Sequence, residues 1–375
     1  MRRHKLVIAA IACTVLVTAA AGCGGGSGSS TPAATGASGS APKPVPLDQL
    51  IARSRKENQL IIYGNAPAPY LKPVVDAFNR VYPWVNVQDT DLSDNQTFSK
   101  YQSEHAQGAR SADLLISSGP ALWVEASRNG VLQAVTPLGL ESFPAYARQA
   151  DGVFVMSPEP IFEGFNVKLL TPNQVPTSYA QLYTDVQQDP GLYKLVSYPP
   201  TNPLAYAAVY GLIHILGWDT VWKYFDLYAP HTKTFNEGLS GLQFLVQGGA
   251  SVGYLSSGLA QGVLKNFKGL ADATFMSDAT PLIPRGIGVT AGASSPASAQ
   301  LFLDFVYSDA GQQALCAAGF EAYANNFKPA SGCTANLVDL YKHVDPTKTF
   351  LVPFSADVVK QQQAITDRWN KAFHG

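Results

Sequence analysis

Residues 59–82, QLIIYGNAPAPYLKPVVDAFNRVY, decide the fold class, because a strand pattern is followed directly by a helix pattern. The run from Gln59 to Tyr63 is a short β-rich segment that ends at the turn-forming residues 64–67. In residues 70–82 the apolar side chains recur at the spacing of one helical face, at Leu71, Val74, Val75, Phe78 and Val81. This stretch predicts a strand followed by an amphipathic helix.

The same alternation of strand and helix patterns continues toward the C-terminal end of the chain. The expected strands are 84–88, 113–116, 153–155, 162–166, 195–198 and 251–255, and segments 280–284 and 286–289 lead out of the second set. The expected helices are 47–57, 98–108, 120–129, 179–185, 204–216, 220–228, 296–307 and 311–318. Such alternation predicts an α/β fold in which mostly parallel sheets are flanked by helices.

Polar side chains follow several of the expected strands. Ligands bind beyond the carboxyl ends of the strands in such sheets, so we expect these side chains to contact a ligand. They are Asn65, Ser117 and Ser118 from the first set of strands, and Asn202, Tyr254, Ser256 and Ser257 from the second. The group is rich in neutral hydrogen-bonding side chains, which favours a small polar or anionic solute. For any single Ser or Asn, a turn or a helix N-cap is the alternative role.

The first 46 residues predict export. A basic start and an uncharged run to Ala21 precede small residues and Cys23, which indicates a signal peptide over 1–22. The segment around Cys23 resembles the lipobox of bacterial lipoproteins, in which this cysteine is acylated and anchors the protein to the outer face of the cell membrane. Residues 23–46 are rich in Gly, Ser, Ala and Pro and predict a flexible linker. A plain signal peptide that releases a soluble protein is the alternative.

Composition limits the remaining possibilities. Loss of residues 1–22 leaves 23 basic and 27 acidic residues, a net charge of about −4, so the chain has no basic character that would indicate nucleic-acid binding. The length after the linker predicts two domains. Cys316 and Cys333 form an even pair in an oxidising compartment, which predicts a disulfide; two free thiols are the alternative. No His or second Cys lies nearby at the spacing of a metal site.

Several phrases, in order, resemble the substrate-binding proteins of ABC importers, in the Fe(III)-type branch of extracellular solute-binding family 1 with the type 2 periplasmic-binding fold. The resemblance covers about residues 59–324. Its carriers are Leu60-Ile61-Ile62-Tyr63 with 70–78, Ser111-Ala112-Asp113-Leu114-Leu115, Glu163-Gly164-Phe165-Asn166 with 167–179, and Ala293-Ser294-Ser295-Pro296 with 299–312.

The resemblance implies two lobes with a ligand cleft between them. Lobe one would contain 47–161 plus 282–375, and lobe two would contain 162–281. The function implied is capture of a solute by hinge closure and delivery to an ABC permease and its ATPase, by a monomer without cofactor or catalytic residues. Ferric-binding relatives carry adjacent tyrosines just after the strand that is 251–255 here. Ser256-Ser257-Gly258 stands in that place and only Tyr254 is close, so a ferric-ion-binding protein is kept as an alternative.

Two further functions stay open at this point: a surface lipoprotein that acts as sensor or adhesin, and a secreted hydrolase. For the hydrolase, the segment 238–242 lacks a complete G-x-S-x-G elbow, and the six histidines share no ligand spacing. Residues 93–95 copy one β-lactamase element without its partners. The segment 358–372 predicts a polar helix that packs on lobe one, anchored by Trp369 and Phe373.

Overall fold

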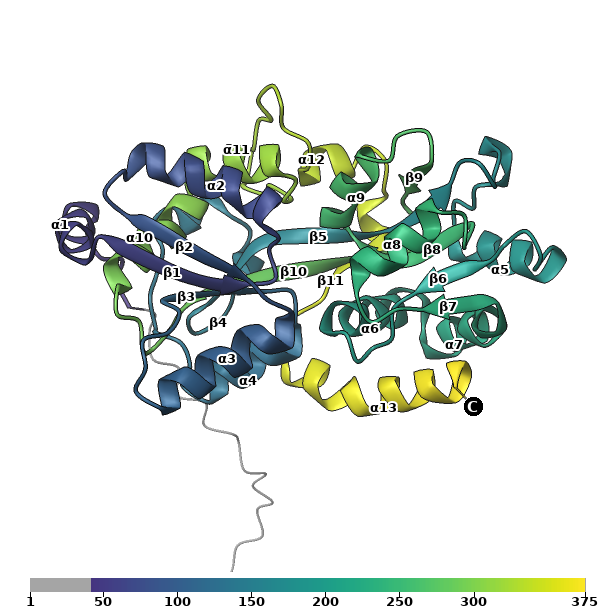
Figure 1. Ribbon diagram of the computed structural model, residues 1–375, viewed down its shortest axis with the longest axis horizontal. Helices are drawn as coiled ribbons and strands as arrows, with labels where there is room; N and C mark the ends of the chain where they lie inside the picture. The colour runs from purple at the N-terminus through teal and green to yellow at the C-terminus, as the bar shows by residue number, and fades with distance from the viewer. Residues whose placement is uncertain (1–41, 375) are drawn as a thin grey trace, which may run out of the picture. The chain divides into compact units, whose positions relative to one another are not determined.

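The computed structural model describes residues 42–374 (Figure 1). The predicted signal peptide, Cys23 and the linker up to residue 41 lie outside the described residues. Within residues 42–374, no helix combines the length and the apolar character needed to cross a membrane.

The first lobe is built around a sheet with strand order β2-β1-β3-β10-β5. Its opening elements are α1 (Leu47–Glu57), β1 (Gln59–Gly64), α2 (Ala68–Val81), β2 (Asn86–Asp91), α3 (Asp94–Ala106), β3 (Leu114–Ser117) and α4 (Pro120–Arg128). β1 pairs parallel with both β2 and β3, whereas β10 (Thr280–Val289) runs antiparallel to β3 and to β5 (Val153–Asn166). α10 (Pro296–Val306) and α11 (Asp309–Ala318) complete the cover of this lobe, because α10 packs on α1 and α11 packs on α2.

The second lobe shares β5 and has the strand order β5-β8-β6-β7. Its elements are α5 (Tyr179–Gln188), β6 (Leu195–Ser197), α6 (Pro203–Leu216), α7 (Trp218–Tyr228), β7 (Thr232–Thr234), α8 (Gly238–Val246), β8 (Val252–Ser257), α9 (Gly258–Lys265) and β9 (Ala271–Thr274). β6 pairs parallel with β7 and β8, and β8 and β9 run antiparallel to β5. The predicted α/β class is confirmed, but the sheet in each half is mixed and not mostly parallel, because the crossing strands β5 and β10 pair antiparallel with their neighbours.

Two long strands, β5 and β10, connect the lobes (Figure 1). The sequence predicted each as two short segments, 153–155 with 162–166 and 280–284 with 286–289; Pro158 and Pro160 lie in the first gap, and Pro284 ends the segment before the second. In the structure Pro158 lies opposite Pro284, and Pro160 lies opposite Leu282. Proline ends a strand pattern because it cannot donate to the ladder, but here the chain stays extended through these positions and forms a continuous crossing.

Two helices that begin with glycine and four of the short strands were not predicted. α8 and α9 start at Gly238 and Gly258, and glycine is a weak helix former. The strands β4 (Arg148–Ala150), β7, β9 and β11 (Thr349–Leu351) contain three or four residues each, too few to show a period.

The C-terminal helix α13 (Ala356–Phe373) contacts elements of both lobes, namely α4, α6 and α7. The sequence placed this segment on lobe one. Tyr210 of α6 donates to Asp357 at 2.8 Å, and Trp369 is buried edge-on against Phe225 of α7. Phe373 stacks on Trp369 with ring centroids 3.9 Å apart, so the two predicted anchors do act together. The helix therefore spans from α4 onto the helices of the second lobe.

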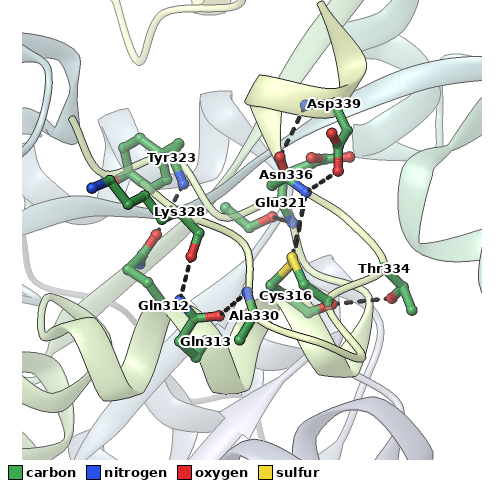
Figure 2. Close-up of a disulfide and its surroundings, with 12 residues drawn as sticks. Gln312, Gln313, Cys316, Glu321, Tyr323, Lys328, Ala330, Thr334, Asn336 and Asp339 are labelled. Atoms are coloured by element: carbon green, nitrogen blue, oxygen red, sulfur yellow. Dashed lines mark hydrogen bonds between the residues drawn. A yellow bond between two sulfur atoms is a disulfide. The ribbon is translucent and has the colours of Figure 1, made fainter. Parts of the chain in front are cut away.

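The predicted disulfide joins Cys316 of α11 to Cys333 (Figure 2). After Cys333, Thr334 donates to the carbonyl of Cys316 at 3.0 Å, and before it the Ala330 N–H donates to Gln313 Oε1 at 3.0 Å, so the segment around Cys333 is held on both sides of the bond.

Replacing both cysteines with alanine should lower the free energy of unfolding by about 3 kcal/mol, because the crosslink closes a loop of 17 residues in the unfolded chain. Urea unfolding followed by tryptophan fluorescence measures the change. Dithiothreitol should shift the midpoint of the wild type and leave the double variant unmoved. Equal midpoints for wild type and variant without reductant would contradict this prediction.

Candidate functional site

The three candidates of the first lobe lie together at the carboxyl ends of β1 and β3. The Asn65 amide donates to the Ser118 hydroxyl at 3.0 Å. Asp94 ties the serines together, because its Oδ1 accepts from Ser117 Oγ at 2.6 Å and from the Ser118 backbone N–H at 2.7 Å. Burial raises the pKa of Asp94, and the hydrogen bond from Ser117 and the charge of Arg285 oppose that rise.

Local sequence explains why Asp94 stands there. It is the first residue of α3, and Ser93 is the N-cap in a capping box with Gln96: the Gln96 N–H donates to Ser93 Oγ and the Ser93 N–H donates to Gln96 Oε1. The capping box fixes the start of α3, and with it Asp94, next to the turn that follows β3.

Trp123 also stabilises the turn that follows β3. Trp123 Nε1 donates to the Ser117 carbonyl at 2.9 Å, and its indole lies against Gly286 and Gly288 of β10. A Cβ on Gly286 would come within 2.2 Å of Trp123 Nε1, so only glycine fits at that position. The turn carrying Ser117 and Ser118 is therefore held from two sides.

A buried arginine connects this turn to the crossing strands. Arg285 of β10 is 2% exposed and makes a two-pronged ion pair with Glu159 of β5, in which Nη2 donates to Oε2 at 3.0 Å and Nε donates to Oε1. Its Nη1 donates to the Asn65 carbonyl at 2.9 Å and also to Asn65 Oδ1. The crossing strands and the loop after β1 are therefore linked by one side chain.

In the second lobe, Asn202 is the N-cap of α6. Its Oδ1 accepts from the backbone N–H groups of Leu204 and Ala205 at 3.0 and 3.2 Å, and its Nδ2 donates to the Asn236 carbonyl at 3.3 Å. The amide is thus used within the lobe, which is the helix-capping alternative that the sequence left open.

Ser256 and Ser257 end β8 beside the crossing strand, opposite Phe162 and Ile161. Next to Ser256, the Tyr198 hydroxyl donates to the Gly238 carbonyl at 3.0 Å. Burial raises the pKa of Tyr198 to about 12, and the Ser256 hydroxyl opposes that rise. Ser257 is half-buried and forms the N-cap of α9 without a side-chain capping bond. Its hydroxyl stands at the start of a helix, a position that suits an acceptor group of a ligand.

A bulge in β8 separates these serines from Tyr254. Gly253 lies opposite Gly164 and Ser256 opposite Phe162, so one extra residue is accommodated on β8, and Leu255 adopts φ 65° in the left-handed region. Left-handed backbone at a buried leucine is strained, and such strain is concentrated at functional sites.

The structure corrects the expectation for Tyr254. Its ring is fully buried between Phe225 and Tyr228, and its hydroxyl lies 3.2 Å from Thr232 Oγ1, inside the second lobe. In the sequence, a tyrosine close to the end of a strand suggests a ligand contact. In the structure, however, the Tyr254 side chain lies on the face of β8 that packs into the core of the second lobe. We therefore no longer count Tyr254 among the ligand-contacting candidates.

The strand-end loops of the two lobes meet. A Cβ on Gly119, next to Ser118, would come within 3.1 Å of Pro203, next to Asn202. On another part of the boundary, a Cβ on Gly262 of α9 would come within 3.1 Å of Tyr70 of α2. The first-lobe cluster of Asn65, Ser117 and Ser118 thus faces the loop that starts α6.

Three site residues were missed by sequence reasoning: Asp94, Glu159 and Arg285. Arg285 is the single charge of the apolar strand β10, and Glu159 stands between two prolines in β5. A lone arginine in one apolar segment and glutamates in another are a signal for a buried ion pair, and that signal could have found Arg285 and Glu159. Across residues 42–374, no group of three or more His, Cys, Asp or Glu side chains is arranged to hold a metal ion.

In this arrangement two lobes are joined by the strands β5 and β10, and the turn next to Ser118 approaches the start of α6 across the lobe boundary. The chain belongs to the bacterial extracellular solute-binding proteins, whose family model matches residues 64–313. The members are solute-binding proteins of ABC transporters.

Solved structures share the fold at low identity. The chain is similar to the substrate-binding protein of an ABC transporter from Agrobacterium tumefaciens, at 18% identity and TM-score 0.75, covering 86% of this chain and 97% of that one. It is also similar to AfuA from Actinobacillus pleuropneumoniae with fructose 6-phosphate bound, at 17% identity and TM-score 0.69, covering 84% and 98%. Iron-bound HitA from Pseudomonas aeruginosa matches at 16% identity and TM-score 0.65, covering 84% and 99%. No significant match was found among curated proteins.

Proposed function

We propose that this chain is the extracytoplasmic receptor of an ABC importer, which captures a small polar or anionic solute between its lobes and delivers it to a permease and its ATPase. The observation that carries the proposal is the meeting of the Asn65, Ser117 and Ser118 cluster with the loop that starts α6, where Gly119 approaches Pro203. A solute held there would contact both lobes and stabilise their closed arrangement by its differential affinity for it.

The two crossing strands are the hinge in this proposal. Lobe one is taken as 47–161 plus 282–375 and lobe two as 162–281, with β5 and β10 running between them. The protein acts as a monomer tethered to the membrane by a lipid on Cys23, and no bond of the solute is made or broken.

A thermal unfolding screen of the purified protein tests the proposal. Fructose 6-phosphate, ferric citrate and thiamine are suitable first solutes, because structures similar to this chain are described with fructose 6-phosphate, with iron and citrate, or as a thiamin-binding protein. A solute that binds only the folded state adds about 2.7 kcal/mol at a hundred times its Kd.

The outcome separates the alternatives. Stabilisation by ferric citrate alone would favour the ferric-ion-binding protein. If the protein binds a solute but the cells take up that solute equally well without a permease, a sensor or adhesin would be favoured. A flat response to every solute, together with turnover of an ester or phosphate substrate, would contradict the receptor proposal.

A further inference from the structure

The Arg285 guanidinium decides which end of the Asn65 amide faces it. Arginine carries only donors, so the atom of the Asn65 side chain that it contacts must be the acceptor Oδ1. The Asn65 carbonyl accepts from the same Nη1 at 2.9 Å, which keeps the residue in place. Glu159 fixes the guanidinium in turn through two parallel hydrogen bonds. The amide of Asn65 therefore has one orientation.

That orientation directs the Asn65 amino group to the turn after β3. Nδ2 lies 3.0 Å from Ser118 Oγ. An amide nitrogen only donates, so the Ser118 oxygen accepts in this contact. Within residues 42–374 this is the only hydrogen bond of the Ser118 hydroxyl, and its own hydrogen has no acceptor there.

Ser117 differs from Ser118 in this respect. Its hydroxyl donates to Asp94 at 2.6 Å and its oxygen accepts from the Gly119 N–H at 3.1 Å, so both functions are used inside the lobe. Of the two neighbouring serines, only Ser118 retains a hydrogen to offer, in the loop that meets Pro203 of the second lobe.

We propose that Arg285 and Glu159 are positioning residues that act through Asn65 to make Ser118 a hydrogen-bond donor to the solute. The solute must then present an acceptor oxygen at this point, as a carboxylate, a phosphate or a carbonyl group does, whereas an ammonium or amide nitrogen donor is disfavoured. The inference rests on the proposed function, because it names the chemistry that the receptor selects on its first-lobe side.

Binding measurements test the polarity of the site. With fructose 6-phosphate as the acceptor-rich probe, Ser118→Ala should weaken affinity about tenfold, the value of a hydrogen bond to a charged group. Ser127→Ala, near the C-terminal end of α4, is the matched control and should leave the affinity for fructose 6-phosphate unchanged. Thiamine, a cationic probe, should bind with no loss in Ser118→Ala. The proposal would be overturned if thiamine bound more tightly than fructose 6-phosphate and if Ser118→Ala abolished the binding of thiamine.

The positioning role is tested by a double-mutant cycle. Arg285→Lys keeps the charge next to Glu159 but loses the Nη1 group that holds Asn65, so it should weaken fructose 6-phosphate binding and should add little to the loss in Ser118→Ala. Fully additive losses in the double variant would mean that Arg285 does not act through Ser118.

Neutron diffraction of the solute-free protein gives a readout that does not depend on any probe. The deuterium of the Ser118 hydroxyl should point away from Asn65, and two deuterium atoms should be seen on the atom of Asn65 nearest Ser118. A deuterium on the line from Ser118 Oγ to Asn65 would overturn the inference even if the receptor function holds. The expected deuterium positions in a protein that binds no solute would leave the inferred polarity intact and contradict only the receptor function.

Discussion

Replacing Arg285 with methionine should lower the free energy of unfolding by about 3–5 kcal/mol, the cost of breaking a buried ion pair from one side. Glu159 is 1% exposed and would be left as a buried charge without its partner, and Asn65 would lose the donor to its carbonyl and its Oδ1. Chemical denaturation in urea, followed by tryptophan fluorescence, measures the loss. We expect this to be the most damaging single substitution in the crossing strands.

The matched control removes both charges. Glu159→Leu combined with Arg285→Met replaces the pair by apolar side chains, which is often neutral or stabilising in buried sites. The double variant should therefore recover most of the stability that Arg285→Met loses, although the Asn65 acceptors remain unpaired. A single variant as stable as the wild type, or a double variant less stable than the single one, would show that the ion pair is not what holds these strands.

Local patterns were sufficient to predict the strand and helix that open the first lobe. β1 and α2 follow from a β-rich run and from apolar residues at helical spacing, both of which are properties of neighbouring residues. The continuity of β5 was not predictable in that way. Pro158 and Pro160 end a strand by local rules, and only pairing with β10, more than 120 positions along the chain, keeps the segment extended. Tertiary pairing overrides the local signal there.

The same distinction between local and tertiary signals explains which site residues could be predicted. Asn65, Ser117 and Ser118 were predicted because the ends of parallel strands meet at one edge of a sheet. In the structure Asn65 bonds directly to Ser118, and Asp94 joins the two serines. The contact between Arg285 and Asn65 spans 220 residues, and no pattern along the sequence states that distance. The prediction that Tyr254 contacts the ligand was wrong for a related reason. The bulge at Leu255 and the aromatic core that packs on β8 are features of the assembled lobe.

A buried acid in the second lobe should make the stability of the protein fall as the pH rises. Glu163 of β5 is 1% exposed, and among residues 42–374 only one of its carboxylate oxygens has a partner, the Tyr179 hydroxyl. Burial, with a smaller contribution from the charge of Asp278, raises the pKa of Glu163 from 4.5 to about 8. The folded protein therefore keeps a proton that the unfolded chain has released.

This difference determines the sign of the pH effect. Between pH 4.5 and about 8 the folded state binds one proton more than the unfolded state at Glu163, so each unit of rising pH costs up to about 1.4 kcal/mol of stability. Glu163→Gln cannot titrate, and the difference in free energy of unfolding between wild type and variant should shift in favour of the variant as the pH rises through that window. Urea unfolding at pH 5, 6, 7 and 8 measures the shift.

Asp304 of α10 provides the control, because it is a second buried acid whose titration ends at a lower pH. Burial raises its pKa from 3.8 to about 7, while Asp304 Oδ1 accepts from the Leu138 N–H at 3.0 Å. In Asp304→Asn the gain relative to wild type should therefore stop growing near pH 7, whereas in Glu163→Gln it should continue to about pH 8. Parallel stability curves for Glu163→Gln and wild type from pH 5 to 8 would mean that Glu163 is already ionised in the folded protein, and that its crossing-strand site is more polar than its contacts indicate.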